Sequence, residues 1–310
     1  MMKKIDVHVH VFGILKGFRG EGELYPLGGG RARWANGQTV DMIPPDLGDK
    51  AFETETCYRF LKEKGVEKAV LLQGSFYGID NEYTALAVKN HPDMFIGAGS
   101  YDPFTRYADQ IYDRLTKELG FRILKFETSS GGGFMSYHPV FDIAEVFSPI
   151  AAKCAQNGQV LVLDIGSPGM ESFQPESVKK LAVTWPELKI VVCHLFAATR
   201  KDAEEKQFEE LKKSFQMLAL PNVYFDLAAV PFNVWPEEYP YPTGLRFIRT
   251  AKEIVGVGKL MWGTDLPSVL FKSSYEQLSD YIIQSGFFTE PELEQIFYKN
   301  ALEVYPFDVK

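Results

Sequence analysis

Short apolar runs rich in Val, Ile and Leu recur along the whole chain, and segments with helical periodicity lie between them. Continuous apolar runs are typical of parallel strands that are covered on both faces. One intervening segment shows the helical pattern directly, because Phe147, Ile150, Ala151 and Cys154 form a single apolar stripe. The predicted strands are Ile5–Phe12, Lys68–Phe76, Phe95–Pro103, Arg122–Thr128, Gln159–Gly166, Lys189–Phe196, Val223–Val230 and Leu260–Pro267.

Strand and helix units alternate eight times in a chain of 310 residues. This pattern predicts a (β/α)8 TIM barrel, an α/β fold, in preference to a doubly wound sheet. The segment Thr289-Glu290-Pro291-Glu292 is a capping-box start for one of the last helices. Since no linker divides the chain, we expect a single domain over residues 1–310.

Two connections are long for a barrel. The first, residues 13–50, separates the first strand from the first helix and is rich in glycine, proline and aromatic residues; the second, residues 129–139, contains the triplet Gly131-Gly132-Gly133. Both follow strands, so we expect both on the catalytic face of the barrel. The triplet lacks the Gly-Lys-Ser/Thr of a phosphate loop, so we interpret it as a mobile lip of the pocket.

Composition excludes several classes of protein. A formal net charge of −8 and a pI near 5.3 argue against nucleic-acid and anionic-membrane partners. No apolar stretch approaches the length of a membrane-spanning helix. The start at residues 1–4 is basic, but the apolar run after it is short and carries Asp6, His8 and His10, so it makes a poor signal peptide. Cys57, Cys154 and Cys193 are far apart and odd in number, which indicates neither a disulfide framework nor a cysteine zinc site. We therefore expect a cytoplasmic protein.

The pair His8-x-His10 is the most informative polar feature of the first strand. Side chains at i and i+2 of a strand share a face, roughly 6.5 Å apart. Two neutral imidazoles so placed can bind one zinc or neighbouring transition-metal ion. The alternative is a pair of core histidines, each of which would need its own hydrogen-bond partner.

Ionisable residues also mark the later strands, although a barrel interior is filled by apolar side chains. Taken singly they have ordinary explanations: one aspartate could cap a helix, and a lysine and a glutamate could pair. Together they place polar groups on six of eight strands, and these would converge at one mouth. They are Lys125, Glu127, Asp164, His194, Asp226 and Asp265.

Two carboxylates in a poorly solvated mouth cannot both ionise cheaply. A divalent cation, or Lys125 between Asp164 and Asp265, would resolve the conflict. A cation held by the two histidines and one or both aspartates would have a mixed nitrogen and oxygen shell. His194 would then stand nearby to donate a proton or polarise a carbonyl.

These residues belong to motifs that occur in order along nearly the whole chain: Asp-x-His-x-His at 6–10, Gly-Phe-x-x-x-Lys at 120–125, Pro-x-Leu-Lys-Ile-Val-Val-Cys-His at 186–194, Trp-Gly-Thr-Asp-Leu-Pro at 262–267 and Asn-Ala at 300–301. The ordered set resembles the amidohydrolase superfamily. The branch it resembles is that of the amidohydrolase-related proteins, which includes aminocarboxymuconate-semialdehyde decarboxylase.

The resemblance implies a role for each matching residue. His8 and His10 would bind the metal, and Asp265 would bind it too and relay a proton. His194 would orient or polarise the substrate oxygen. Lys125 matches a position often present in this branch; in binuclear relatives a lysine there is carbamylated and bridges two metals.

One position departs from the family pattern. The family usually has a histidine ligand near the end of the fifth strand, where this chain has Leu163-Asp164-Ile165-Gly166. Asp164 could itself bind the metal, the site could bind metal weakly with His8 and His10 as hydrogen-bond donors, or the site could be inactive. We expect Asp164 to be a ligand; His138, on a loop, is the only nearby replacement.

Two reactions fit this set of residues. In hydrolysis, metal-bound water is the nucleophile, Asp265 the base, and His194 stabilises the oxyanion. In nonoxidative decarboxylation, Asp265 or His194 delivers a proton to carbon. A third interpretation, of a different class, is a catalytically inactive barrel that binds a small molecule.

We expect a metal-dependent hydrolase of a small organic acid, ester, lactone or amide, with one divalent metal, zinc in preference to manganese or iron. A carboxylated substrate would need cations, for which Lys125, Arg31 and Arg33 are candidates, with Arg19 as a further one, and Trp34 would form an apolar wall. Members of the family are often dimers, so a homodimer is a further expectation.

Overall fold

Eight parallel strands form a ring at the centre of the molecule. The computed structural model describes residues 2–307, and its main sheet runs in the order β1-β6-β7-β8-β9-β10-β11-β12. Each strand falls on a predicted run, which confirms the barrel. The strands are β1 (Lys4–Val9), β6 (Val66–Leu71), β7 (Phe95–Gly99), β8 (Ile123–Glu127), β9 (Val160–Asp164), β10 (Lys189–Val192), β11 (Val223–Asp226) and β12 (Leu260–Met261).

Residues of the first motif close the ring between β12 and β1. Asp265 N donates to His8 O at 2.8 Å. One step earlier, the buried Asp6 carboxylate accepts from Thr264 N at 2.9 Å and from Thr264 Oγ1 at 2.7 Å. The first and last strands are thus joined at the level of His8, which fixes the spacing between His8 and Asp265.

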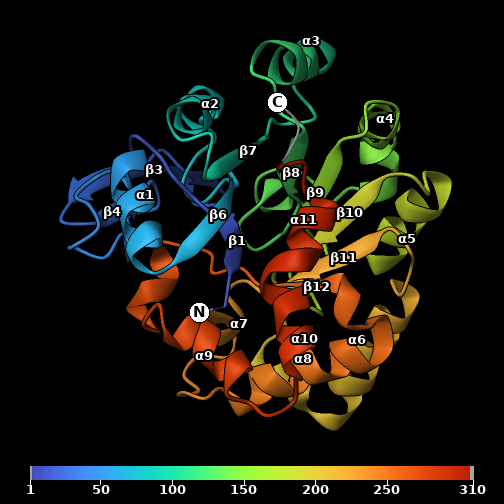
Figure 1. Ribbon diagram of the computed structural model, residues 1–310. Coiled ribbons are helices and arrows are strands. Elements are labelled where there is room, and N and C mark those ends of the chain that lie inside the picture. Colours follow the sequence, from blue (N-terminus) through green and yellow to red (C-terminus); the bar gives the residue numbers. More distant parts are fainter. Residues whose placement is uncertain (1, 308–310) are drawn as a thin grey trace.

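Helices surround the ring of strands (Figure 1). The apolar stripe predicted around Phe147 is buried on one of them, and the capping box at Thr289 forms as predicted. The helices are α1 (Thr54–Glu63), α2 (Asn81–Asn90), α3 (Ala108–Asp113), α4 (Ile143–Gln156), α5 (Pro175–Thr184), α6 (Glu205–Met217), α7 (Val230–Asn233), α8 (Pro242–Val255), α9 (Gln277–Ile283), α10 (Glu290–Glu294) and α11 (Asn300–Val304), with π-helical turns at Arg114–Glu118 and Gln295–Lys299.

The long connection of residues 13–50 has regular structure of its own. It contains a four-stranded antiparallel sheet, which lies at one side of the barrel next to α1 in Figure 1. Phe18 N donates to Ser75 O at 2.8 Å, so this inserted sheet is anchored to the segment that follows β6. Its strands are β2 (Phe18–Arg19), β3 (Gly22–Gly28), β4 (Arg31–Trp34) and β5 (Thr39–Asp41).

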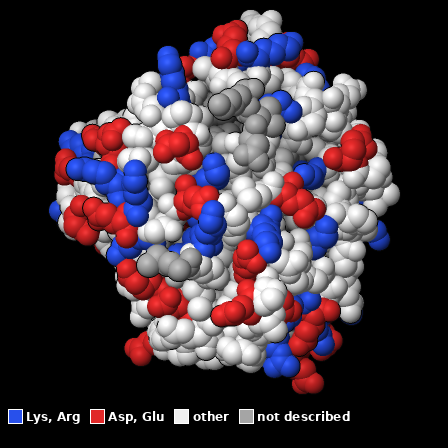
Figure 2. Space-filling view, in the orientation of Figure 1, with Lys and Arg blue, Asp and Glu red and all other residues white. Residues whose placement is uncertain are grey.

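The surface charge and the state of the cysteines are as the sequence led us to expect. On the face shown in Figure 2, acidic and basic side chains are interspersed and neither sign forms a continuous patch. Cys57, Cys154 and Cys193 are free and buried. Among the described helices, none has the length and apolar character needed to cross a membrane.

Candidate metal centre

A cavity of about 380 Å³ opens at the carboxyl ends of the barrel strands. We call it the inner cavity. It contains four of the predicted site residues, His10, Asp164, His194 and Asp265, so the strand-end residues do converge as expected. Its full lining is His10, Gly74, Phe76, Tyr77, Glu127, Ser129, Gly131, Gly132, Gly133, Asp164, Met170, His194, Phe232, Asn233, Asp265 and Ser268.

His8 lies fully buried beside this cavity with one ring nitrogen held and the other free. Its Nδ1 is 3.0 Å from Asp226 Oδ2, while Nε2 has no hydrogen-bond partner among the described residues. Burial lowers the pKa of His8 to about 4, so the ring is neutral near pH 7. A neutral ring that donates from Nδ1 to a carboxylate has its lone pair on Nε2, which is the form that binds a metal.

His10 presents the same nitrogen to the same place. Its Nδ1 donates to Leu72 O at 3.0 Å, and its Nε2 lies 3.0 Å from Asp265 Oδ1. The same carboxylate oxygen is 3.6 Å from His8 Nε2. Burial opposes ionisation of Asp265, but the hydrogen bond with His10 and the nearby imidazoles outweigh it and lower the pKa. An ionised oxygen therefore faces two imidazole nitrogens.

These three side chains fit a divalent metal ion. One ligand atom each from His8, His10 and Asp265 lies within 4.8 Å of the other two. Two acceptor atoms 3.0 Å apart need a proton or a cation between them, and the unpartnered His8 Nε2 needs one as well. Two imidazole nitrogens and one carboxylate oxygen suit zinc, with room for a further ligand from the cavity.

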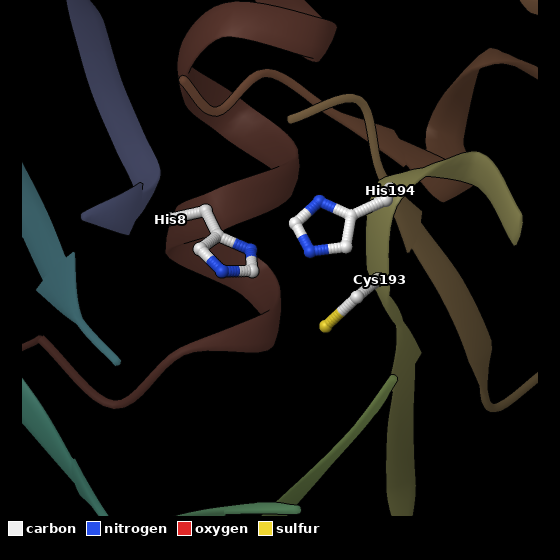
Figure 3. Close-up of side chains that lie close together, drawn as sticks. All are labelled: His8, Cys193 and His194. Atoms are coloured by element: carbon white, nitrogen blue, oxygen red, sulfur yellow. The ribbon is translucent and has the colours of Figure 1, made fainter. Parts of the chain in front are cut away.

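A second group of potential ligands shares His8 but suits a metal less well. His8, Cys193 and His194 each offer an atom within 4.8 Å of the others, and Figure 3 shows the Cys193 sulfur and the His194 ring directed toward His8. Burial raises the pKa of the Cys193 thiol well above its ordinary value, whereas the thiolate is the ligating form. The cluster of His8, His10 and Asp265 is the better candidate.

Asp226 holds two strands of the site together. The buried carboxylate accepts from His194 N at 2.7 Å and from Ala228 N at 3.1 Å on Oδ1, while Oδ2 faces His8. Burial disfavours its charge, but His8 outweighs this effect and the pKa of Asp226 is lowered. The contacts of Asp226 are those of a residue that positions others.

The backbone at His194 is unusual. Residues 194–197 form a left-handed turn with φ values of 58°, 51°, 67° and 46°, and none of them is glycine. Left-handed backbone costs roughly 1–2 kcal/mol for each such residue. The hydrogen bond from His194 N to Asp226 helps to hold the turn. Asp265 also has a positive φ, 72°, so strain is concentrated at two of the predicted catalytic residues.

The fifth-strand aspartate lies on another part of the cavity wall. Asp164 Oδ1 accepts from Gly166 N at 2.9 Å, and Asp164 is not in the group formed by His8, His10 and Asp265. Burial raises its pKa. The structure therefore brings Asp164 to the inner cavity without bringing it to the other expected ligands.

Lys125 is enclosed behind this wall and does not line the cavity. Its Nζ is 3.5 Å from Glu127 Oε1 and has no hydrogen bond within residues 2–307. Glu127 Oε2 accepts from Ser75 N at 2.6 Å, and a Cβ on Gly74 would lie 2.8 Å from the same oxygen. Glu127, and not Lys125 as predicted, therefore lines the inner cavity, and the buried Lys125 lies beside it as an opposite charge.

The residues expected from the inserted sheet are not brought to the cavity. Arg31 and Arg33 are exposed on β4, and neither lines the inner cavity. Trp34 is buried, with the Arg19 guanidinium carbon 4.4 Å from the centre of its ring, and it does not line the inner cavity. His138 pairs with Asp102 at 2.7 Å and is also absent from the lining.

Several lining residues could not be identified from the sequence, because they lie in the loops after the strands and are not histidine, lysine or acidic residues. The Tyr77 ring is tilted against the His10 ring, with ring centres 4.9 Å apart, and its hydroxyl donates to Ser268 Oγ at 2.7 Å. Met170 and Asn233 come from later connections. The only available signal was their place just after a predicted strand, which is common to many loop residues.

A family model described as Amidohydrolase matches residues 5–307. The chain belongs to this Amidohydrolase family. The match confirms the resemblance that the ordered motifs indicated. It extends from the first strand to the last helix and includes every residue that lines the inner cavity. No curated protein matches the chain.

Solved structures of other amidohydrolases share the fold. A probable 2-pyrone-4,6-dicarboxylic acid hydrolase from Acinetobacter baumannii, solved with citric acid, has 18% identity and a TM-score of 0.66, with coverage of 98% of this chain and 99% of that one. A zinc-bound amidohydrolase from Burkholderia multivorans has 13% identity, a TM-score of 0.71 and coverage of 97% and 98%. The 5-carboxyvanillate decarboxylase of Sphingomonas paucimobilis has 14% identity, a TM-score of 0.53 and coverage of 80% and 81%.

Proposed function

We propose that the protein is a metal-dependent hydrolase that acts on a small carboxylated ester, lactone or amide. The observation that carries this proposal is the free Nε2 of His8, which faces the same place as His10 Nε2 and Asp265 Oδ1. When bound there, a divalent cation such as zinc would activate water as a nucleophile and polarise the substrate.

The chain's own groups would divide the remaining work. Asp265 lines the cavity with its side chain 21% exposed, so it can both hold the cation and accept a proton. His194 donates from Nδ1 to Ala228 O at 3.3 Å. Burial opposes its protonation, but Asp265 and the neighbouring carboxylates outweigh this and raise the pKa of His194, and the protonated ring has an Nε2–H that can polarise or stabilise a substrate oxygen.

Decarboxylation is the second candidate function. Asp164 and His194 add two proton-exchanging groups to the cavity besides Asp265. A decarboxylase needs such a group to deliver a proton to carbon. Among the neighbours in fold are both a probable hydrolase and a decarboxylase, which supports either reaction for a member of this family.

The first experiment measures bound metal in the purified protein and in His8→Ala, with His138→Ala as the matched control. The His138 imidazole pairs with the Asp102 carboxylate and does not line the inner cavity. We expect near-stoichiometric metal in the parent and in His138→Ala, and its loss in His8→Ala. Full activity of metal-free protein that is indifferent to chelators would overturn the proposal.

A second experiment separates the two reactions. The probes are 2-pyrone-4,6-dicarboxylate for hydrolysis and 5-carboxyvanillate for decarboxylation, the compounds named for two of the neighbours. Incorporation of labelled oxygen from water into the product supports the hydrolase. Release of carbon dioxide without uptake of water supports the decarboxylase.

A further inference from the structure

A second, larger cavity adjoins the inner one. Its volume is about 860 Å³, and the two cavities share Met170 and Asn233 in their walls. We call it the outer cavity. It is built from the segments that follow β9, β10 and β11, and its lining is Ser167, Pro168, Gly169, Met170, Thr199, Arg200, Lys201, Asp202, Glu204, Asn233, Trp235, Glu237 and Thr243.

Two of the three acidic residues in this lining accept hydrogen bonds from a nearby backbone N–H and threonine hydroxyl. The Asp202 carboxylate accepts from Thr199 N at 2.7 Å and from Thr199 Oγ1 at 2.8 Å. The Glu237 carboxylate accepts from Thr243 N at 2.9 Å and from Thr243 Oγ1 at 2.8 Å. The first pair of bonds forms the capping box of the helical turn Arg200–Ala203, and the second holds Glu237 at the start of α8, so both carboxylates already have hydrogen-bond donors.

The two basic residues of the outer cavity are free to bind a ligand. Arg200 and Lys201 are exposed, and neither forms an ion pair with any residue of the described range 2–307. Lys272 adds a third cation nearby, since its Nζ lies 4.1 Å from the Trp235 ring centre. In a chain of net charge −8, two unpaired cations at a cavity wall, Arg200 and Lys201, favour an anionic ligand, although the exposed Glu204 lines the same wall.

The residue between the two cavities also lacks a partner. Asn233 Nδ2 is buried and has no hydrogen-bond acceptor in the described part of the chain. An unbonded buried amide N–H is costly, and here it belongs to the wall that both cavities share. An oxygen atom of a ligand that passes from one cavity to the other would satisfy it.

We propose that the outer cavity binds a second anionic group, a carboxylate or a phosphate, of a substrate whose other end reacts in the inner cavity. Arg200 and Lys201 bind this remote group, and Asn233 donates to the chain between the two ends. The inference rests on the proposed function, because it takes the inner cavity as the place of reaction. It narrows the substrate class to extended molecules with charged groups at both ends.

The test is calorimetric binding of four acids to the metal-loaded protein: hexanoate, malonate, adipate and 5-phosphonopentanoate. The variant is Arg200→Gln/Lys201→Gln, and the matched control is Lys206→Gln/Lys213→Gln, which removes two exposed charges from α6 outside the outer cavity. We expect adipate or the phosphonate to bind about fivefold more tightly than hexanoate or malonate, with the preference weakened by salt. The tighter of the two long acids identifies the remote group as carboxylate or phosphate.

The double variant should lose this preference, whereas hexanoate binding and metal content stay unchanged. The control variant should behave like the parent. Equal affinity of the parent for hexanoate and the long acids, or a preference that survives in the double variant, would overturn the inference. Loss of metal and of all binding by the parent would instead overturn the proposed function on which it rests.

Discussion

The carboxyl ends of the barrel strands and the inserted sheet both carry charged and aromatic residues, yet only the former deliver them to the inner cavity. His10 and Asp265 follow β1 and β12 and meet at 3.0 Å. Arg31 and Arg33 remain exposed on β4, and Trp34 is buried within the insertion. A closed parallel barrel brings every strand end to one mouth, whereas an insertion orients its side chains according to its own packing.

The largest effect on turnover is expected from His194→Asn. Asparagine tolerates the left-handed backbone at this position, so the turn should survive. Loss of the imidazole should lower turnover about 100-fold while metal content stays intact. Steady-state kinetics and elemental analysis measure the two quantities; loss of metal would show that His194 holds the ion and is part of the metal cluster.

Asp226→Asn should come next, with metal affinity lowered about 10- to 100-fold. The new amide must still accept from His194 N and Ala228 N through its oxygen, so its NH2 group faces His8 Nδ1. His8 would then carry its proton on Nε2, the nitrogen that ligation requires to be free. Metal titration measures the affinity, and nitrogen NMR of the imidazoles reports the tautomer. An unchanged tautomer would contradict this role.

Asp164→Asn is the matched comparison, because the same chemical change is made at another strand end. Asp164 lies outside the group of His8, His10 and Asp265, so metal affinity should change by less than about threefold. Competition with a chromogenic chelator measures it beside Asp226→Asn. A loss as large as that of Asp226→Asn would restore Asp164 as the fourth ligand and would mean that the wall moves when metal binds.

The smallest effect is expected in the inserted sheet. Arg31→Gln/Arg33→Gln removes two exposed charges that do not line the inner cavity. The change in kcat/KM should be below about twofold, as for most exposed charges. A clear rise in KM for a carboxylated substrate would show that the insertion closes over the cavity and would remove the contrast between the two regions.

The apolar runs predicted the positions of the strands better than their lengths. All eight predicted runs overlap a strand of the barrel, but Leu260–Pro267 contains only the two residues of β12. The apolar pattern continues beyond the strand because Leu266 is still buried, although Asp265 has already turned into left-handed backbone. Burial and strand geometry are separate properties, and an apolar run reports only the first.

The inserted sheet could have been predicted in part. Asn36-Gly37 and the glycines at 28–30 are turn signals, and buried and exposed residues alternate along β4. The left-handed turn at 194–197 had no such signal, since its residues are ordinary in sequence and its shape depends on the distant Asp226.

The sequence by itself determined the barrel and some of the residues at its mouth, because periodicity encodes burial and every parallel strand end faces the same side. Only the tertiary structure decided which of these residues meet. It placed Asp265 beside His8 and His10, and Asp164 elsewhere on the wall. It also fixed the free nitrogen of His8 through Asp226, a residue 218 positions away, because hydrogen-bond partners are set by spatial proximity and not by spacing along the chain.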